Sequence, residues 1–191
     1  IKISLDEIMK KNVPVNSGIN HSLKDGYTQI GLIKLKPDSV AIVGPKAELD
    51  KINSIYTAKD TLSQLSNITK GMLNLILPSK LINCSHNEVN YLLDIQQISE
   101  RIIVDIPVSV INKIKGIRVF PSPQTVSLTV IGGTNQISKI KPSDISVFVD
   151  FKLWSISQSF YEPKVTIPYD ILNWRDLSPR TIELGVARES K

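Results

Sequence analysis

Short apolar runs recur along the chain and are separated by polar residues, prolines and glycines. The runs at 40–43 and 126–131 are rich in β-branched residues and are bounded by proline and glycine, which is typical of strands. The segments 145–149 and 181–186 alternate apolar with other residues, which is the period of a strand with one buried face. The pattern predicts an all-β protein.

Helix is expected only in short pieces. Residues 47–53 are predicted to form one or two turns, with Leu49 and Ile52 facing a sheet, and residues 61–65 are a second short candidate. Each half of the chain should therefore contain one or two short helical turns within a largely β structure.

Four prolines lie inside or beside the predicted strands, namely Pro14, Pro78, Pro107 and Pro168. Proline has no N–H group to donate to a strand ladder, so it is confined to edges, strand ends and irregular positions. We therefore expect small, irregular sheets in which these prolines mark edges, ends or crossovers.

The chain contains an internal repeat. The stretch 44–52 aligns without gaps on 132–140, and further matches flank this anchor in the same order in both halves. They pair 13–15 with 106–108, 37–40 with 123–126, 55 with 145, 75–78 with 165–168 and 89–93 with 182–186. Repetition of one order of features indicates two tandem copies of a small domain.

The repeat sets the expected domain boundaries. Residues 1–10 are assigned to the end of a preceding segment, 11–98 to the first copy and 99–191 to a divergent second copy. The junction expected at 99–101 is too short to act as a flexible linker, so the sequence predicts a stiff rod. The chain starts with Ile1 rather than Met, and we expect an N-terminal part ahead of it.

Several motifs of the first copy resemble the YbbR-like domain family. They are VPV at 13–15, PDSV at 37–40, VGP at 43–45, LDKI at 49–52 and IYT at 55–57. The stretch from 13 to Gly26 and Tyr27 resembles the Bacteroidetes and Chlorobi type of the family. The second copy departs from the pattern, with Gly133 where proline is usual and two extra residues before Gly132.

The resemblance implies a fold, a location and a partner. The fold is a small all-β domain of crossed ribbons, cradle-like in shape and related to the C-terminal domain of a ribosomal protein of the 5S RNA site. The location is outside the cytoplasm, on a single-pass membrane protein whose transmembrane helix precedes this sequence. The partner is another membrane or envelope protein, with a membrane diadenylate cyclase of cyclic di-AMP signalling as the candidate.

The charge of the chain favours a protein partner over a nucleic acid. The formal net charge is +5, from 23 basic and 18 acidic side chains. The excess is shared between the two halves and contains no run of four basic residues, whereas a nucleic-acid surface concentrates its charge in one patch. The pattern is typical of a solvated surface.

The sequence offers little that points to catalysis. Cys84 is the single cysteine, so an internal disulfide is excluded. Cys84 and His86 could be paired as thiolate and base, or joined by Glu88 and Asp94 as metal ligands, but the flanking Ser and Asn residues indicate a loop. Neither GxGxxG nor GxxxxGK[ST] occurs. We expect no catalytic residue, no metal, no cofactor and no small-molecule substrate.

Aromatic residues concentrate in the second copy. Trp154, Phe160 and Tyr161 flank a polar stretch that reads as a loop or edge. Trp and Tyr are favoured where a few residues dominate binding to a partner protein, so these three are the candidate partner contacts. The alternative is that they belong to the core or to a satellite of it.

Three functions remain open at this stage. The first is a non-catalytic, extracytoplasmic binding or scaffold module that regulates a membrane diadenylate cyclase, as the family resemblance implies. The second is an RNA-binding module, by analogy with the ribosomal relative, although fold alone does not determine function. The third is a generic adhesin-like β-module or an accessory domain of a hydrolase.

Overall fold

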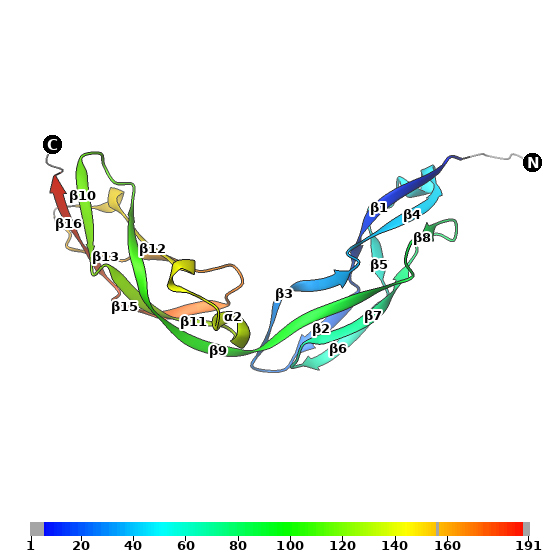
Figure 1. Cartoon of the computed structure of the whole chain (residues 1–191), viewed down its shortest axis with the longest axis horizontal. Coiled ribbons are helices and arrows are strands. Elements are labelled where there is room, and N and C mark those ends of the chain that lie inside the picture. Colours follow the sequence, from blue (N-terminus) through cyan, green and yellow to red (C-terminus); the bar gives the residue numbers. More distant parts are fainter. Residues whose placement is uncertain (1–5, 156, 189–191) are drawn as a thin grey trace, which may run out of the picture. The chain divides into compact units, whose positions relative to one another are not determined.

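The computed structural model describes residues 6–155 and 157–188 and consists mostly of strands, as predicted (Figure 1). The chain divides into two compact units, the first ending at Gln96 and the second beginning at Gln97. The predicted junction at 99–101 lies inside one long strand, β9 (Glu88–Ile111), rather than in a separate linker. The stiffness of the pair stays a prediction.

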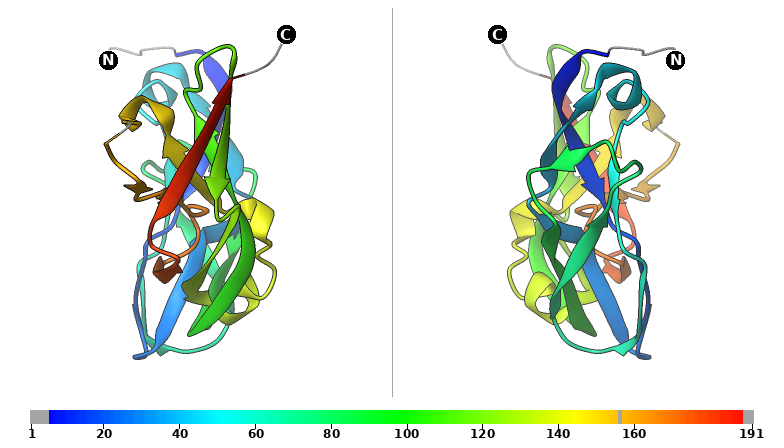
Figure 2. Two further views of the ribbon diagram at one scale, coloured as in Figure 1. Left: turned by 90° about the vertical axis from the view of Figure 1, so that its left-hand side faces the viewer. Right: turned by 90° about the vertical axis from the view of Figure 1, so that its right-hand side faces the viewer.

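From residue 6 onward, the first unit contains eight strands and one helical turn besides the start of β9. They are β1 (Ile8–Asn16), β2 (Ile19–Leu23), β3 (Tyr27–Lys36), β4 (Ser39–Pro45), α1 (Lys46–Leu49), β5 (Ile55–Thr57), β6 (Asp60–Leu65), β7 (Thr69–Ile76) and β8 (Asn83–Cys84). Strand β1 pairs antiparallel with β4, β7 with β9, and β2 runs parallel to β6. The right-hand view of Figure 2 shows β1 in dark blue.

Two expectations for the first unit were wrong. Strand β1 begins at Ile8, which pairs with Pro45, so part of the stretch 1–10 belongs to the domain; residues 1–5 lie outside the described residues. Residues 61–65 form strand β6 instead of a helical turn. Leu62 and Leu65 both pack on the core because Gln64 has φ 55°, and this irregularity shifts the register of β6 against β2.

Over residues 97–155 and 157–188, the second unit contains the end of β9 and seven further strands. They and the short helices are β10 (Ile117–Ser122), β11 (Thr125–Gly133), α2 (Thr134–Ile137), η1 (Pro142–Asp144), β12 (Ser146–Asp150), η2 (Phe151–Leu153), β13 (Phe160–Tyr161), β14 (Lys164–Thr166), β15 (Asn173–Ser178) and β16 (Ile182–Arg188). Strand β11 pairs antiparallel with both β9 and β15. The left-hand view of Figure 2 shows β16, in red, alongside its antiparallel partner β10.

Two of the four prolines expected at edges, strand ends or crossovers, Pro14 and Pro107, lie where a strand changes partners. Strand β1 pairs antiparallel with β4 up to Pro14 and then parallel with β5 from Val15. Strand β9 likewise pairs with β11 up to Pro107 and with β12 from Val108. In both units the residue after the proline donates its N–H to a carbonyl just before the antiparallel partner, from Val15 to Asp38 and from Val108 to Gln124, at 2.8 Å in each case.

In each unit a basic side chain donates hydrogen bonds to the carbonyl oxygens at the end of the helical turn. The sequence alone did not point to either side chain. Lys11 Nζ donates to the carbonyl oxygens of Leu49, at 3.2 Å, and Ile52, at 2.7 Å. Arg101 Nη1 donates to three carbonyl oxygens at the end of α2, those of Ile137, Ser138 and Ile140, at 2.8–3.1 Å. The last carbonyls of a helix lack partners within the helix, and a cation placed there satisfies them.

The buried apolar side chains gather in clusters within each unit. Leu49 and Ile52 are buried, as predicted, in a cluster with residues of β1, β4 and β5. A second cluster of the first unit gathers around Leu93 and Tyr91 of β9. The larger core of the second unit collects residues from β9, β11 and β12 together with Ile137 of α2. Within the described residues, no helix is both long enough and apolar enough to cross a membrane.

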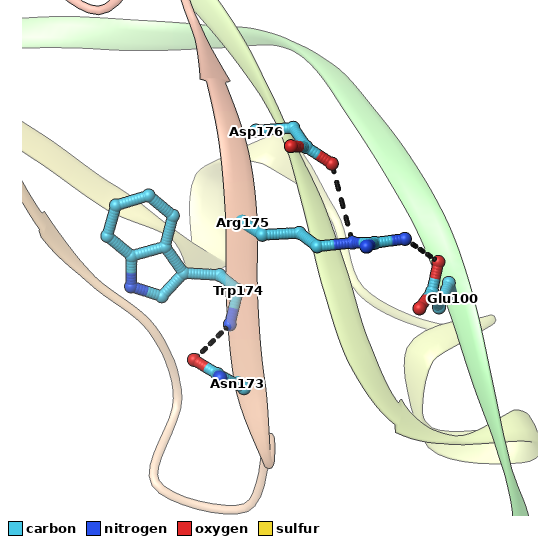
Figure 3. A network of polar contacts seen from close by, with 5 residues as sticks. All are labelled: Glu100, Asn173, Trp174, Arg175 and Asp176. Carbon is cyan, nitrogen blue, oxygen red and sulfur yellow. Dashed lines mark hydrogen bonds and ion pairs between the residues drawn. The ribbon is translucent and has the colours of Figure 1, made fainter.

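Strand β15 is held on its exposed face by an ion pair. Arg175 Nη2 lies 2.5 Å from Glu100 Oε2 of β9, and its Nε lies 3.4 Å from Asp176 (Figure 3). The side chain of Trp174 extends from the other side of the strand and packs against the core. Both partners of the pair are about half exposed, so the contact contributes at most about 1 kcal/mol to stability.

Replacing Lys11 with Met removes the ammonium group and keeps most of the aliphatic stem. The carbonyl oxygens of Leu49 and Ile52 then lose a charged donor, and we expect the free energy of unfolding of the first unit to fall by about 1–3 kcal/mol. Denaturant unfolding measures this difference. The exposed neighbour Lys10 provides the control, because Lys10→Met should change stability by less than about 0.5 kcal/mol. Equal effects of the two substitutions would contradict the capping role.

Candidate partner-contact surface

The aromatic segment of the second unit begins at a capped helical turn. Asp150 precedes η2 and accepts hydrogen bonds from the Lys152 backbone N–H, at 3.0 Å, and from Asn112 Nδ2, at 2.8 Å. These two hydrogen bonds hold the pKa of the Asp150 carboxyl below its usual value, since both favour the charged form. The turn places Phe151 in the core, where it is 4% exposed.

The indole ring of Trp154 stacks on the buried ring of Phe151. The rings of Phe151 and Trp154 stack with centroids 5.5 Å apart and planes 16° from parallel. Trp154 is half-buried and packs on the edge of the core, and it also lines a groove of about 640 Å³ with Phe120 and Leu184. Because Phe151 supports the indole from below, Trp154 presents a rigid aromatic surface to this groove.

Tyr161 does not have the role that the sequence suggested. Its side chain is 4% exposed, so the prediction that it contacts a partner is wrong. Its hydroxyl accepts from the Ser155 N–H at 2.9 Å and lies within donating distance of two carbonyl oxygens, those of Ser155 at 3.1 Å and Gln158 at 2.9 Å. Successive strand residues face opposite sides, and in β13 Tyr161 faces the core while Phe160 faces solvent.

Phe160 is 56% exposed and lines a second groove. This groove has a volume of about 510 Å³ and includes Phe148 and Leu153, of which Leu153 is 64% exposed. Gln158 lines both grooves. Trp154 and Phe160 are therefore brought to neighbouring grooves rather than to one pocket, and together they form what we call the aromatic surface.

Sequence reasoning missed two contributors to this surface. Leu153 lies beside Trp154 in the chain but is aliphatic, and Phe120 belongs to β10, far from the aromatic segment in sequence. Phe120 reaches this surface because β10 pairs with β16. No local sequence pattern reveals that pairing.

The residues considered for catalysis or metal binding lie elsewhere, in β8, in the loop that follows it and in the first unit's part of β9. Cys84 is half-buried against the core of the first unit, and the exposed His86 Nδ1 lies 2.9 Å from the Ser85 hydroxyl. Within residues 6–155 and 157–188, no three His, Cys, Asp or Glu side chains gather as metal ligands.

The cap at Asp150 generates a prediction about pH. A carboxyl whose pKa is lowered in the folded state stabilises that state at neutral pH, and this contribution is lost as the pH falls through the lowered pKa. We expect Trp154 fluorescence to change below pH 3.8, the usual pKa of the carboxyl. The measurement uses a Trp174→Phe background, because the chain has two tryptophans.

The control for this titration is Asp150→Asn, which keeps a capping oxygen and cannot titrate. Its Trp154 fluorescence should stay flat over the same pH range. A transition of equal size in this variant would show that other carboxyl groups control the segment.

Comparison with known proteins identifies the first unit. Residues 13–91 match the family described as YbbR-like protein. The chain is 23% identical over 143 residues to the CdaA regulatory protein CdaR of Bacillus subtilis strain 168, a match that covers 73% of this chain. The chain spans only 29% of the length of that relative.

Two solved structures are also similar to this chain. The solution structure of SuR18C from Streptococcus thermophilus is 26% identical, covers 50% of this chain and 91% of its own, and has a TM-score of 0.37. The crystal structure of a YbbR-like protein from Streptococcus pneumoniae TIGR4 is 10% identical, covers 98% and 100%, and has a TM-score of 0.36. The family match lies wholly within the first unit, and residues 13–91 therefore form a YbbR-like domain, as the motifs at 37–57 predicted.

Proposed function

We propose that this chain is a non-catalytic binding module that regulates a membrane diadenylate cyclase by contacting it. The observation that carries the proposal is the YbbR-like domain at 13–91 combined with the likeness to the CdaA regulatory protein CdaR. The proposal extends the function named for that relative to a chain that covers less than a third of it.

The second unit acts in this proposal as a divergent YbbR-like copy. Its support is the repetition of internal contacts described above. Both units have a proline where one strand changes partners, at Pro14 and Pro107, and both have a basic side chain, Lys11 or Arg101, on the carbonyls that end the helical turn. Two copies in series would present two different faces to a partner.

Membrane anchorage and an extracytoplasmic position are part of the same proposal. They follow from the YbbR-like family resemblance, in which a transmembrane helix precedes the repeats. A cyclase embedded in the same membrane would then meet these domains at high local concentration, and modest contact areas would suffice for regulation.

The aromatic surface is the proposed contact in the second unit. Trp154 is supported by Phe151 and Phe160 is solvent-exposed, so neither ring needs to leave the core to bind. Rigid aromatic side chains lose little conformational entropy on binding and often dominate the affinity of an interface.

The test is cross-linking of the full-length protein in its own membranes, followed by purification and mass spectrometry. We expect recovery of a diadenylate cyclase and a loss of at least about tenfold in recovery for Trp154→Ala and Phe160→Ala, as for residues worth about 1.4 kcal/mol or more in an interface. Tyr169→Ala is the matched control, because Tyr169 is 99% exposed and does not line either groove.

Two outcomes would contradict the proposal in different ways. Recovery of other envelope proteins without a cyclase would remove the regulatory function and leave a scaffold. Recovery of the cyclase at equal levels with all three variants would keep the partner and exclude the aromatic surface as its contact.

A further inference from the structure

The first unit carries a groove that the aromatic surface does not explain. It has a volume of about 720 Å³ and is formed by β3, β7 and β9. Met72 and Leu92 contribute apolar side chains to it. Met72 is 63% exposed, and its flexible, polarisable side chain is of the kind found in adaptable binding surfaces.

Behind this groove, on the core face of the same strands, a glycine packs against an aromatic ring. Gly71 of β7 pairs with Tyr91 of β9, and a Cβ atom built on Gly71 would lie 2.6 Å from the tyrosine ring. The ring is buried in the core of the first unit. Because successive strand residues face opposite sides, Met72 and Leu92 lie on the other face, and the tight contact behind them fixes the spacing of β7 and β9.

Three lysines surround the apolar part of the groove. Lys34 and Lys36 lie two residues apart on β3 and so face the same side of the strand, and Lys70 is paired with Leu92 across β7 and β9. All three are exposed, and none forms an ion pair within the described part of the chain. None of the described residues that line the groove is acidic, so its lining carries three positive charges and no negative one.

We infer that this groove binds an acidic, partly apolar segment of a protein partner. The lysines would attract and orient carboxylates, and burial of Met72 and Leu92 under apolar side chains of the segment would supply affinity. The inference rests on the proposed function, because it names the chemistry by which the first unit would recognise the partner that the module regulates.

An anionic membrane surface fits the same groove less well. Stable attraction to anionic lipids typically uses clusters of about four to eight basic residues, whereas three surround this groove. The apolar residues here line a hollow rather than a protruding edge, and a hollow of this volume accommodates a segment of chain better than a flat layer of headgroups.

The direct test is an NMR titration of the 191-residue chain with two synthetic peptides. In the first, Glu alternates with Leu and Phe; in the second, Gln replaces each Glu. We expect the Glu peptide to shift the amide signals of β3, β7 and β9 and to bind at least tenfold more tightly than the Gln peptide. The affinity should fall as salt concentration rises, because exposed charges are screened.

Variants locate the site. The double variant Lys36→Glu, Lys70→Glu should weaken binding of the Glu peptide at least tenfold, and Lys10→Glu, which changes an exposed lysine outside the groove, should not. All the lysines concerned are exposed, and the dispersion of the amide spectrum checks that each variant is folded. Equal binding of the two peptides, or shifts confined to other strands, would overturn the inference.

Phosphatidylglycerol vesicles test whether the groove binds a membrane instead. Recovery of the cyclase by cross-linking, compared with peptide binding, separates this inference from the proposed function. Binding to phosphatidylglycerol vesicles that the double variant abolishes, without binding of the Glu peptide, would assign the groove to a membrane and overturn the inference. If the cyclase is recovered from membranes but the Glu peptide does not bind, the inference about the groove is overturned and the proposed function stands. Peptide binding at the groove without cyclase recovery would support the groove and overturn the proposed function.

Discussion

The architecture of both units depends on one strand that changes partners at a proline. Up to Pro14 or Pro107 the strand pairs antiparallel, and directly after it the strand pairs parallel with a different neighbour. Proline can stand at this point because the position requires no N–H donor for a ladder. The residue that follows has its own N–H satisfied by the turn before the antiparallel partner. The crossed ribbons and the enclosed cores follow from this change of partner.

The carbonyl oxygens at the end of the helical turn need hydrogen-bond donors, and in each unit a basic side chain supplies them. The antiparallel partner strand leads directly into a single helical turn, whose last carbonyl oxygens would otherwise lack donors. Lys11 and Arg101 reach these oxygens from the strand that lies alongside. The change from Lys to Arg preserves a charged donor, and Arg adds a third carbonyl partner. Lys11 and Arg101 lie outside the stretches 44–52 and 132–140 that align without gaps, so that alignment does not pair them.

The two candidate binding surfaces differ in chemistry. The aromatic surface of the second unit combines rigid rings with polar and charged side chains, among them Glu162 and Glu183. It depends on Phe151, which stacks on Trp154, and on the Tyr161 hydroxyl, which binds the Ser155 N–H. The groove of the first unit combines the apolar Met72 and Leu92 with lysines and has no acidic residue in its lining. A partner that contacted both would meet aromatic rings on one unit and lysine side chains on the other.

The sequence by itself determined the β character, the partner change at two prolines and the YbbR-like domain at 13–91, because strand periodicity, proline chemistry and family motifs are local properties. The tandem repeat stays a prediction. Only tertiary structure decided which aromatic residues remain accessible. Phe160 and Tyr161 are adjacent and similar in sequence, yet pairing with β16 turns one to solvent and the other to the core. Segment 61–65 forms a strand because β2 pairs with it. The groove of the first unit forms where β3, β7 and β9 meet. These outcomes depend on contacts between distant segments, which no local pattern records.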